Sequence, residues 1–130
     1  MALIAGLADT SVFVAAESGR PVDTDALPSI LRVSVITVGE LQQGVLAAVD
    51  TDVRARRLAT LTRASSLEPI LITESVAEAW AALRVRLRSA GRSMPINDSW
   101  IAATAITLGI AVVTQDEDYA NVPGLTTIRV

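Results

Sequence analysis

The sequence contains no cysteine, no histidine and no lysine, and each absence excludes a class of chemistry. Without cysteine, neither disulfide bonds nor thiolate metal sites can form. Without histidine, Ser-His-Asp and Cys-His catalysis and imidazole-bound zinc are excluded. Without lysine, Schiff-base chemistry and the phosphate-binding lysine of nucleotide loops are excluded. Any polar chemistry therefore depends on Asp, Glu, Ser, Thr, Tyr and Arg.

The length and hydropathy indicate one globular domain. The 130 residues, 51% of them hydrophobic, are enough to bury a core, so we expect a single domain over residues 1–130. Residues 1–8 lack a basic segment and are followed by Asp9, which does not fit a signal peptide. The uncharged run between Asp98 and Asp116 is shorter than the ~20 apolar residues of a membrane helix. We expect no membrane segment and a cytoplasmic location, which the lack of cysteine also favours.

Hydrophobic periodicity predicts strands that are separated by helices. The expected strands are residues 3–8, 30–36, 69–72, 111–114 and 125–129. The expected helices are residues 10–18, 38–49 with Thr37 as N-cap, 52–65, 74–90 between Thr73 and Gly91, and 98–108 with Asn97 as N-cap. This alternation predicts βαβ units, and hence a mainly parallel sheet with helices on both faces.

Five acids fall where such a sheet forms ligand sites. Asp9 closes the first expected strand, and Asp116 and Asp118 follow the strand over residues 111–114. Asp98 begins a helix, and Glu40 lies in the first turn of the helix after the second strand. Because ligands bind at the carboxyl ends of parallel strands, we expect these side chains to converge.

Converging carboxylates repel one another, by about 4 kcal/mol for a pair 4 Å apart at a surface-like dielectric. A hard divalent cation offsets that repulsion, and Mg²⁺ prefers a few carboxylates together with water and phosphate oxygens. Mn²⁺ accepts the same ligands. The sequence therefore predicts a Mg²⁺ site, with Mn²⁺ as a possible substitute.

Each acid also has a purely structural explanation when it is taken alone. Glu40 fits a capping box that begins at Thr37, and Asp98 complements the positive end of a helix dipole. Asp116 and Asp118 fit a solvated turn, and Asp9 fits a helix cap. Only the joint pattern favours a functional site.

Four segments together resemble the motifs of one known family, in the family's order. They are Asp9-Thr10-Ser11-Val12, Thr37-Val38-Gly39-Glu40-Leu41, Asn97-Asp98-Ser99-Trp100-Ile101-Ala102-Ala103 and Val113-Thr114-Gln115-Asp116-Glu117-Asp118-Tyr119. They are similar to the motifs of VapC-type toxins of the PIN-domain family. The sequence departs from that pattern at Gln115, where relatives often carry arginine, and at Tyr119, where phenylalanine is commoner.

The resemblance implies a PIN-like three-layer α/β/α fold and a Mg²⁺-dependent endoribonuclease, the toxin of a VapBC toxin-antitoxin system. It implies that Asp9, Glu40, Asp98 and Asp116 are catalytic and bind the metal, with Asp118 at the edge of the site. Thr10 or Thr114 would support them through hydrogen bonds. It also implies an RNA substrate, a VapB-type antitoxin and a homodimer.

Three alternatives remain open at this point. The chain could be a catalytically silent PIN-fold module that binds RNA or protein. A receiver-like signalling domain also places aspartates at strand ends and binds Mg²⁺, but the missing lysine counts against it. Hydrolases with an aspartate nucleophile usually carry a second aspartate two residues later, whereas Asp9 is followed by Ser11.

The charge distribution is compatible with an RNA substrate. The net charge is −3, but setting the five candidate acids aside leaves nine acids against eleven arginines. The arginines cluster in two segments, at Arg54, Arg56, Arg57 and Arg63 and at Arg84, Arg86, Arg88 and Arg92. Such clusters either bind phosphates or form solvated helix faces. Trp80 and Trp100 fall on apolar helix stripes and are expected in the core or at an interface.

Overall fold

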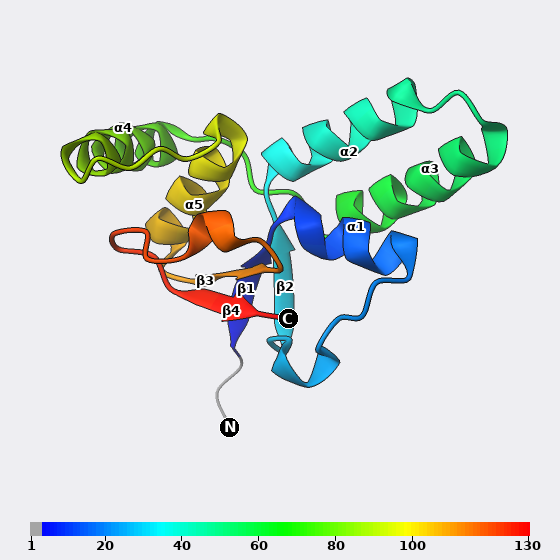
Figure 1. Ribbon diagram of the computed structural model, residues 1–130, viewed down its shortest axis with the longest axis horizontal. Helices are drawn as coiled ribbons and strands as arrows, with labels where there is room; N and C mark the ends of the chain where they lie inside the picture. The colour runs from blue at the N-terminus through cyan, green and yellow to red at the C-terminus, as the bar shows by residue number, and fades with distance from the viewer. Residues whose placement is uncertain (1–3) are drawn as a thin grey trace.

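The computed structural model describes residues 4–130, which form a four-stranded parallel sheet between two layers of helices (Figure 1). The strands are β1 (Ala5–Ala8), β2 (Ile30–Val33), β3 (Ala111–Thr114) and β4 (Thr127–Arg129). They are arranged in the order β2-β1-β3-β4, and every neighbouring pair is parallel. The predicted parallel sheet is confirmed.

Helices cover both faces of this sheet, as the alternation of elements predicts. They are α1 (Thr10–Ser18), α2 (Val35–Ala47), α3 (Thr51–Ser65), α4 (Glu74–Ser89) and α5 (Ile96–Leu108), with the 3-10 turns η1 (Thr24–Ala26) and η2 (Glu117–Tyr119). On one side α5 packs on β1 and β3 and carries α4, while α1 packs on the other side and contacts the α2–α3 hairpin (Figure 1). The three-layer α/β/α arrangement is therefore confirmed.

The core lies mainly between α5 and the sheet. Ile101, Ala102 and Ala105 of α5 are fully buried against Leu7 of β1 and Val112 of β3. Burial of each large aliphatic side chain contributes about 1.5–3 kcal/mol. The small alanines let α5 approach the strands closely, and this packing fixes the position of the start of α5.

The boundary between β2 and α2 differs from the prediction. The strand expected over residues 30–36 ends at Val33, and Ser34, rather than Thr37, is the N-cap of α2. The Ser34 hydroxyl accepts a hydrogen bond from the backbone N–H of Ile36 at 3.0 Å, which fixes the helix start. Glu40 consequently lies in the second turn of α2, so the capping-box explanation for this residue is wrong.

Other boundaries also need correction. The segment expected as a strand over residues 69–72 forms only an isolated bridge between Ser34 and Ile70. Helix α5 begins at Ile96, with Pro95 rather than Asn97 at the N-cap, and the last strand begins at Thr127. In the first expected strand, Leu3 lies outside the described residues.

The predicted start of α4 at Thr73 and the predicted end of α1 at Gly19 are confirmed. The Thr73 hydroxyl accepts a hydrogen bond from the N–H of Val76 at the start of α4. Gly19 ends α1 with φ 75°, a conformation that only glycine adopts at little cost. Within residues 4–130, no helix combines the length and the hydropathy that crossing a membrane requires.

Candidate functional site

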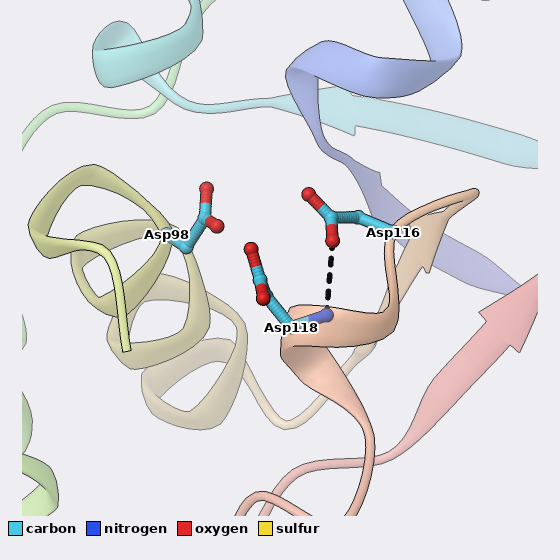
Figure 2. Close-up of side chains that lie close together, drawn as sticks. All are labelled: Asp98, Asp116 and Asp118. Atoms are coloured by element: carbon cyan, nitrogen blue, oxygen red, sulfur yellow. Dashed lines mark hydrogen bonds between the residues drawn. The ribbon is translucent and has the colours of Figure 1, made fainter. Parts of the chain in front are cut away.

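Three carboxylates meet at the carboxyl end of the sheet. Asp98 comes from the first turn of α5, Asp116 from the segment after β3, and Asp118 from η2. One oxygen from each side chain lies within 4.8 Å of the other two (Figure 2). The packing of α5 on β3 therefore brings acids from separate segments into one cluster.

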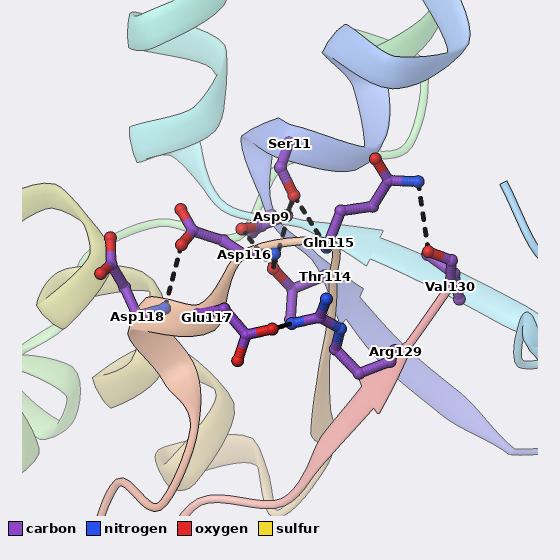
Figure 3. A network of polar contacts seen from close by, with 9 residues as sticks. All are labelled: Asp9, Ser11, Thr114, Gln115, Asp116, Glu117, Asp118, Arg129 and Val130. Carbon is purple, nitrogen blue, oxygen red and sulfur yellow. Dashed lines mark hydrogen bonds and ion pairs between the residues drawn. The ribbon is translucent and has the colours of Figure 1, made fainter. Parts of the chain in front are cut away.

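In the turn after β3, the side chains of three consecutive acids, Asp116, Glu117 and Asp118, point in two different directions. Asp116 is the N-cap of η2, and its Oδ1 accepts a hydrogen bond from the N–H of Asp118 at 2.9 Å. This turn directs Asp116 and Asp118 toward Asp98. Glu117 points the other way and forms an exposed ion pair with Arg129 at 2.7 Å (Figure 3). Only two of the three acids therefore belong to the cluster.

Asp9 is held next to this cluster by hydroxyl groups. Its side chain is 3% exposed, and it accepts hydrogen bonds from Ser11 Oγ at 2.6 Å and from Thr114 Oγ1 at 2.8 Å (Figure 3). Thr114 Oγ1 also accepts a hydrogen bond from the N–H of Asp116 at 2.8 Å. Thr114 therefore links Asp9 to the cluster, in the supporting position that the resemblance implies.

Glu40 comes from α2 and is bonded to Thr10, the residue after Asp9. Thr10 Oγ1 donates to Glu40 Oε1 at 2.7 Å and lies 3.1 Å from the hydroxyl of the buried Thr37. Glu40 and Asp9 are not members of the three-carboxylate group. The structure thus gathers Asp98, Asp116 and Asp118 most tightly, although the sequence placed Asp118 only at the edge.

The electrostatics of the cluster oppose the ionised state. Burial, and secondarily the negative charge of Asp116, raises the pKa of Asp98 to about 7. Burial also raises the pKa of Asp9, against the opposing hydrogen bonds from Ser11 and Thr114. The ion pair of Arg129 with Glu117 is the only salt bridge among residues 4–130. No arginine side chain in that range therefore pairs with the clustered acids.

Two side chains near the acids were not given a role from the sequence. Ser11 bonds Asp9 and also accepts a hydrogen bond from the N–H of Gln115 at 3.0 Å, so it ties α1 to the end of β3. The spacing Asp9-Thr10-Ser11 is the available signal, since a hydroxyl two residues after a helix-capping aspartate reaches it easily. Tyr119 was noted only as a departure from phenylalanine.

The Tyr119 hydroxyl is an unusual feature of the site. It is buried and has no hydrogen-bond partner among the described residues. Burial, followed by the charges of Asp9 and Asp98, raises its pKa, so it stays protonated. Buried polar groups normally have a partner. A buried donor without a partner among residues 4–130 therefore lies beside the acids.

The donor set matches a hard divalent cation. Three carboxylate oxygens from two segments, the start of α5 and the turn after β3, lie close enough to share one ion, and no arginine within residues 4–130 forms a salt bridge with them. Mg²⁺ binds proteins through a few carboxylates and retains coordination positions for water and phosphate oxygens. Asp98, Asp116 and Asp118 therefore fit a magnesium site, with Asp9 immediately behind it.

Comparison with known proteins gives consistent matches. The family model of the PIN domain matches residues 7–125 of the chain. The chain is 50% identical to Ribonuclease VapC4 of Mycobacterium tuberculosis over 95% of each chain. It is 44% identical to Ribonuclease VapC5 of the same organism over 97% of this chain and 93% of the relative. The crystal structure of VapBC-5 from M. tuberculosis, of the VapBC family of toxin-antitoxin systems, contains a chain with TM-score 0.89 and 41% identity, covering 97% of this chain and 98% of the other.

Proposed function

The chain belongs to the PIN-domain family as a VapC-type ribonuclease, and on this premise we propose that its acidic cluster holds the Mg²⁺ ion used to hydrolyse RNA phosphodiester bonds. PIN-domain ribonucleases in general depend on a divalent metal. The observation that carries the choice of site is the convergence of Asp98, Asp116 and Asp118 within 4.8 Å, without a neutralising arginine among residues 4–130. Mn²⁺ would fit the same oxygens.

The residues of the site divide the work according to their surroundings. Asp98, Asp116 and Asp118 hold the ion. Each oxygen of Asp9 accepts a hydrogen bond from a hydroxyl group, and these two bonds fix the position of the Asp9 carboxyl group next to the cluster. Glu40, whose carboxylate accepts a hydrogen bond from Thr10, orients water or substrate. When bound, the ion neutralises charge on the scissile phosphate and lowers the pKa of a water that serves as nucleophile. We assign Asp9, Glu40, Asp98 and Asp116 as the catalytic set on this basis.

The protein is the toxin of a VapBC toxin-antitoxin system, with RNA as its substrate and a VapB-type antitoxin as its partner. The VapC relatives and the VapBC-5 structure support this assignment. We further propose that the toxin is a homodimer, that residues 1–130 form one domain, and that it acts in the cytoplasm, where its RNA substrates are found.

Cleavage assays on purified protein test the proposal. RNA should be cut in the presence of Mg²⁺ or Mn²⁺ and left intact in EDTA. Asp98→Asn should abolish cleavage because it removes a charged ligand while keeping the size of the side chain. Glu74→Gln is a matched control, since Glu74 is an exposed acid in the first turn of α4.

Two results would contradict the proposal. Full activity of Asp98→Asn would refute the site assignment. If the folded protein binds Mg²⁺ but does not cleave RNA, the result would instead favour the catalytically silent PIN-fold module.

A further inference from the structure

A basic hollow lies at the C-terminal end of α4. It has a volume of about 360 Å³ and is lined by Arg84, Leu87, Arg88, Gly91, Arg92 and Ser93. Its three arginines belong to one of the two clusters that the sequence singles out. The acidic cluster does not include any of these residues, so the hollow is a separate feature of the surface.

The positive charge of this hollow is not neutralised by the protein. None of the three arginines forms a salt bridge within residues 4–130. Arg84 donates to the carbonyl of Met94 at 3.1 Å, and Arg92 donates to the carbonyls of Ala120, at 2.8 Å, and Asn121. A carbonyl oxygen fixes a guanidinium without cancelling its charge, and each guanidinium has five N–H donors. Most of the donors therefore remain available to an anion.

Arg84 is also positioned by an aromatic stack. Trp80 and Trp100 lie face to face, with ring centroids 4.3 Å apart and planes within 4° of parallel. Trp80 Nε1 donates to Ser99 Oγ at 3.0 Å, which joins α4 to the start of α5. The Arg84 guanidinium carbon lies 6.0 Å from the Trp80 ring centroid, within the range of a cation–π interaction. The orientation of Arg84 is thus restrained before any ligand arrives.

The hollow is connected to both segments that carry the clustered acids. The Ala120 carbonyl bound by Arg92 is two residues from Asp118, which corresponds to at most about 7 Å of chain. The Met94 carbonyl bound by Arg84 is four residues from Asp98, or at most about 14 Å. A strand of RNA that passes over the acidic cluster can therefore continue toward the hollow.

We propose that Arg84, Arg88 and Arg92 form a binding site for a backbone phosphate of the RNA substrate, outside the phosphodiester that is cleaved; this rests on the proposed function. Guanidinium groups match phosphate oxygens through paired hydrogen bonds. The acidic cluster repels the backbone of RNA, so the substrate needs cationic contacts elsewhere. RNA is favoured over an acidic protein segment because it presents a phosphate at every nucleotide, at whatever point the strand crosses the hollow.

Arg88 provides the sharpest test because it is exposed and, within residues 4–130, its side chain does not bind backbone carbonyls, unlike Arg84 and Arg92. A fluorescent single-stranded RNA is titrated at several KCl concentrations with Mg²⁺ present, in the Asp98→Asn protein so that the RNA stays intact. Arg88→Gln should reduce the slope of log K against log [KCl] by about 0.7 and weaken binding about five-fold at 0.1 M salt. Arg88→Glu should weaken binding further. Arg56→Gln, which removes an equivalent exposed charge from α3, should leave the slope unchanged.

An unchanged slope for Arg88→Gln would overturn the phosphate site, and so would an equal loss for Arg56→Gln, which would indicate only general surface charge. Weaker binding of polyglutamate, with RNA binding unaffected, would assign the hollow to an acidic protein segment and also overturn the proposal. The readout is binding, so it is separate from cleavage. If the unsubstituted protein fails to cut RNA, the proposed function is refuted, but the binding assay can still confirm the phosphate site. If the protein cuts RNA and Arg88→Gln leaves the salt slope of RNA binding unchanged, only the phosphate site is refuted.

Discussion

The two ends of the parallel sheet differ sharply, although the same strands form both. At the carboxyl end, β1 and β3 lead to Asp9 and Asp116, and buried hydroxyls and carboxylates face one another (Figure 3). At the opposite end, a hollow of about 580 Å³ is lined by uncharged residues that include Ile4, Ile110 and Ala111. The carboxyl end accumulates negative charge that burial penalises, whereas the residues that line the hollow at the opposite end carry no charge. We therefore expect substitutions at the first end to change activity and pH response, and substitutions toward the second to change stability alone.

The largest expected effect is a difference in RNA cleavage between variants of two neighbouring acids, Asp116 and Glu117, at the carboxyl end. Asp116→Asn should lower RNA cleavage by about 100-fold or more, because stabilisation of charge by a bound metal is worth several kcal/mol. Glu117→Gln should retain near-normal cleavage, since Glu117 faces Arg129 and stands apart from the cluster. Steady-state cleavage assays measure both variants. Comparable losses of cleavage in the two variants would show that Asp116 and Glu117 do not have the different roles that their orientations indicate.

A second pair tests whether the body of the sheet contributes stability alone. A Cβ at Gly6 of β1 would lie 2.6 Å from Val113 Cγ2 and 2.9 Å from Pro28 Cγ. Gly6→Ala should therefore lower the free energy of unfolding by about 1–3 kcal/mol. In the control Gly39→Ala, the added Cβ meets no described atom within 4 Å apart from the neighbouring backbone of α2 itself, so this variant should raise it by about 0.5–1 kcal/mol. Urea denaturation gives both values.

Cleavage per folded molecule should be preserved in Gly6→Ala at temperatures where the variant is folded. A specific loss of activity in this variant would break the contrast between the two ends, because it would show that packing in the sheet also sets the catalytic geometry.

The pH dependence of stability should reveal the free-energy cost of ionising the buried carboxyl groups at the carboxyl end. The pKa of Asp98 is about 7 in the folded protein against its ordinary 3.8, so the folded state binds more protons than the unfolded state between these values. Stability of the metal-free protein should therefore fall as pH rises through this window and level off above it. The raised pKa of Asp9 acts in the same direction. Mg²⁺ should restore stability most strongly above pH 7, where the cluster is ionised.

Thermal unfolding with and without Mg²⁺ between pH 4 and pH 8 measures this effect. Asp98→Asn, which cannot ionise, should show a flatter profile and a smaller response to Mg²⁺. Parallel profiles for the two proteins would contradict the assignment of the pH dependence to Asp98.

The smallest expected effect concerns the unpartnered hydroxyl at the carboxyl end. Tyr119→Phe should raise the free energy of unfolding by up to about 1 kcal/mol, because it removes a buried donor that has no partner among the described residues. Urea denaturation of the two proteins measures the change. A clear loss of stability in Tyr119→Phe would mean that the hydroxyl has a partner.

Sequence reasoning located helices more accurately than it located the edges of strands. The end of α1 and the start of α4 follow local signals at Gly19 and Thr73, which act within one turn of chain. The β2–α2 boundary was missed because residues 30–36 form a run rich in β-branched side chains, which favours a strand locally. Burial against the sheet and the Ser34 cap override that preference after Val33.

The sequence by itself determined the available chemistry, the alternation of strands and helices, and the acids that end up at the carboxyl end of the sheet. These follow from composition and short-range periodicity. Only the tertiary structure decided that Asp118 joins Asp98 and Asp116, that Glu117 turns toward Arg129, and that Glu40 lies in the second turn of α2, outside the three-carboxylate group. Those outcomes depend on how α5 packs on β3 and on where η2 turns. Such contacts join residues far apart in the chain, and local patterns do not encode their distances.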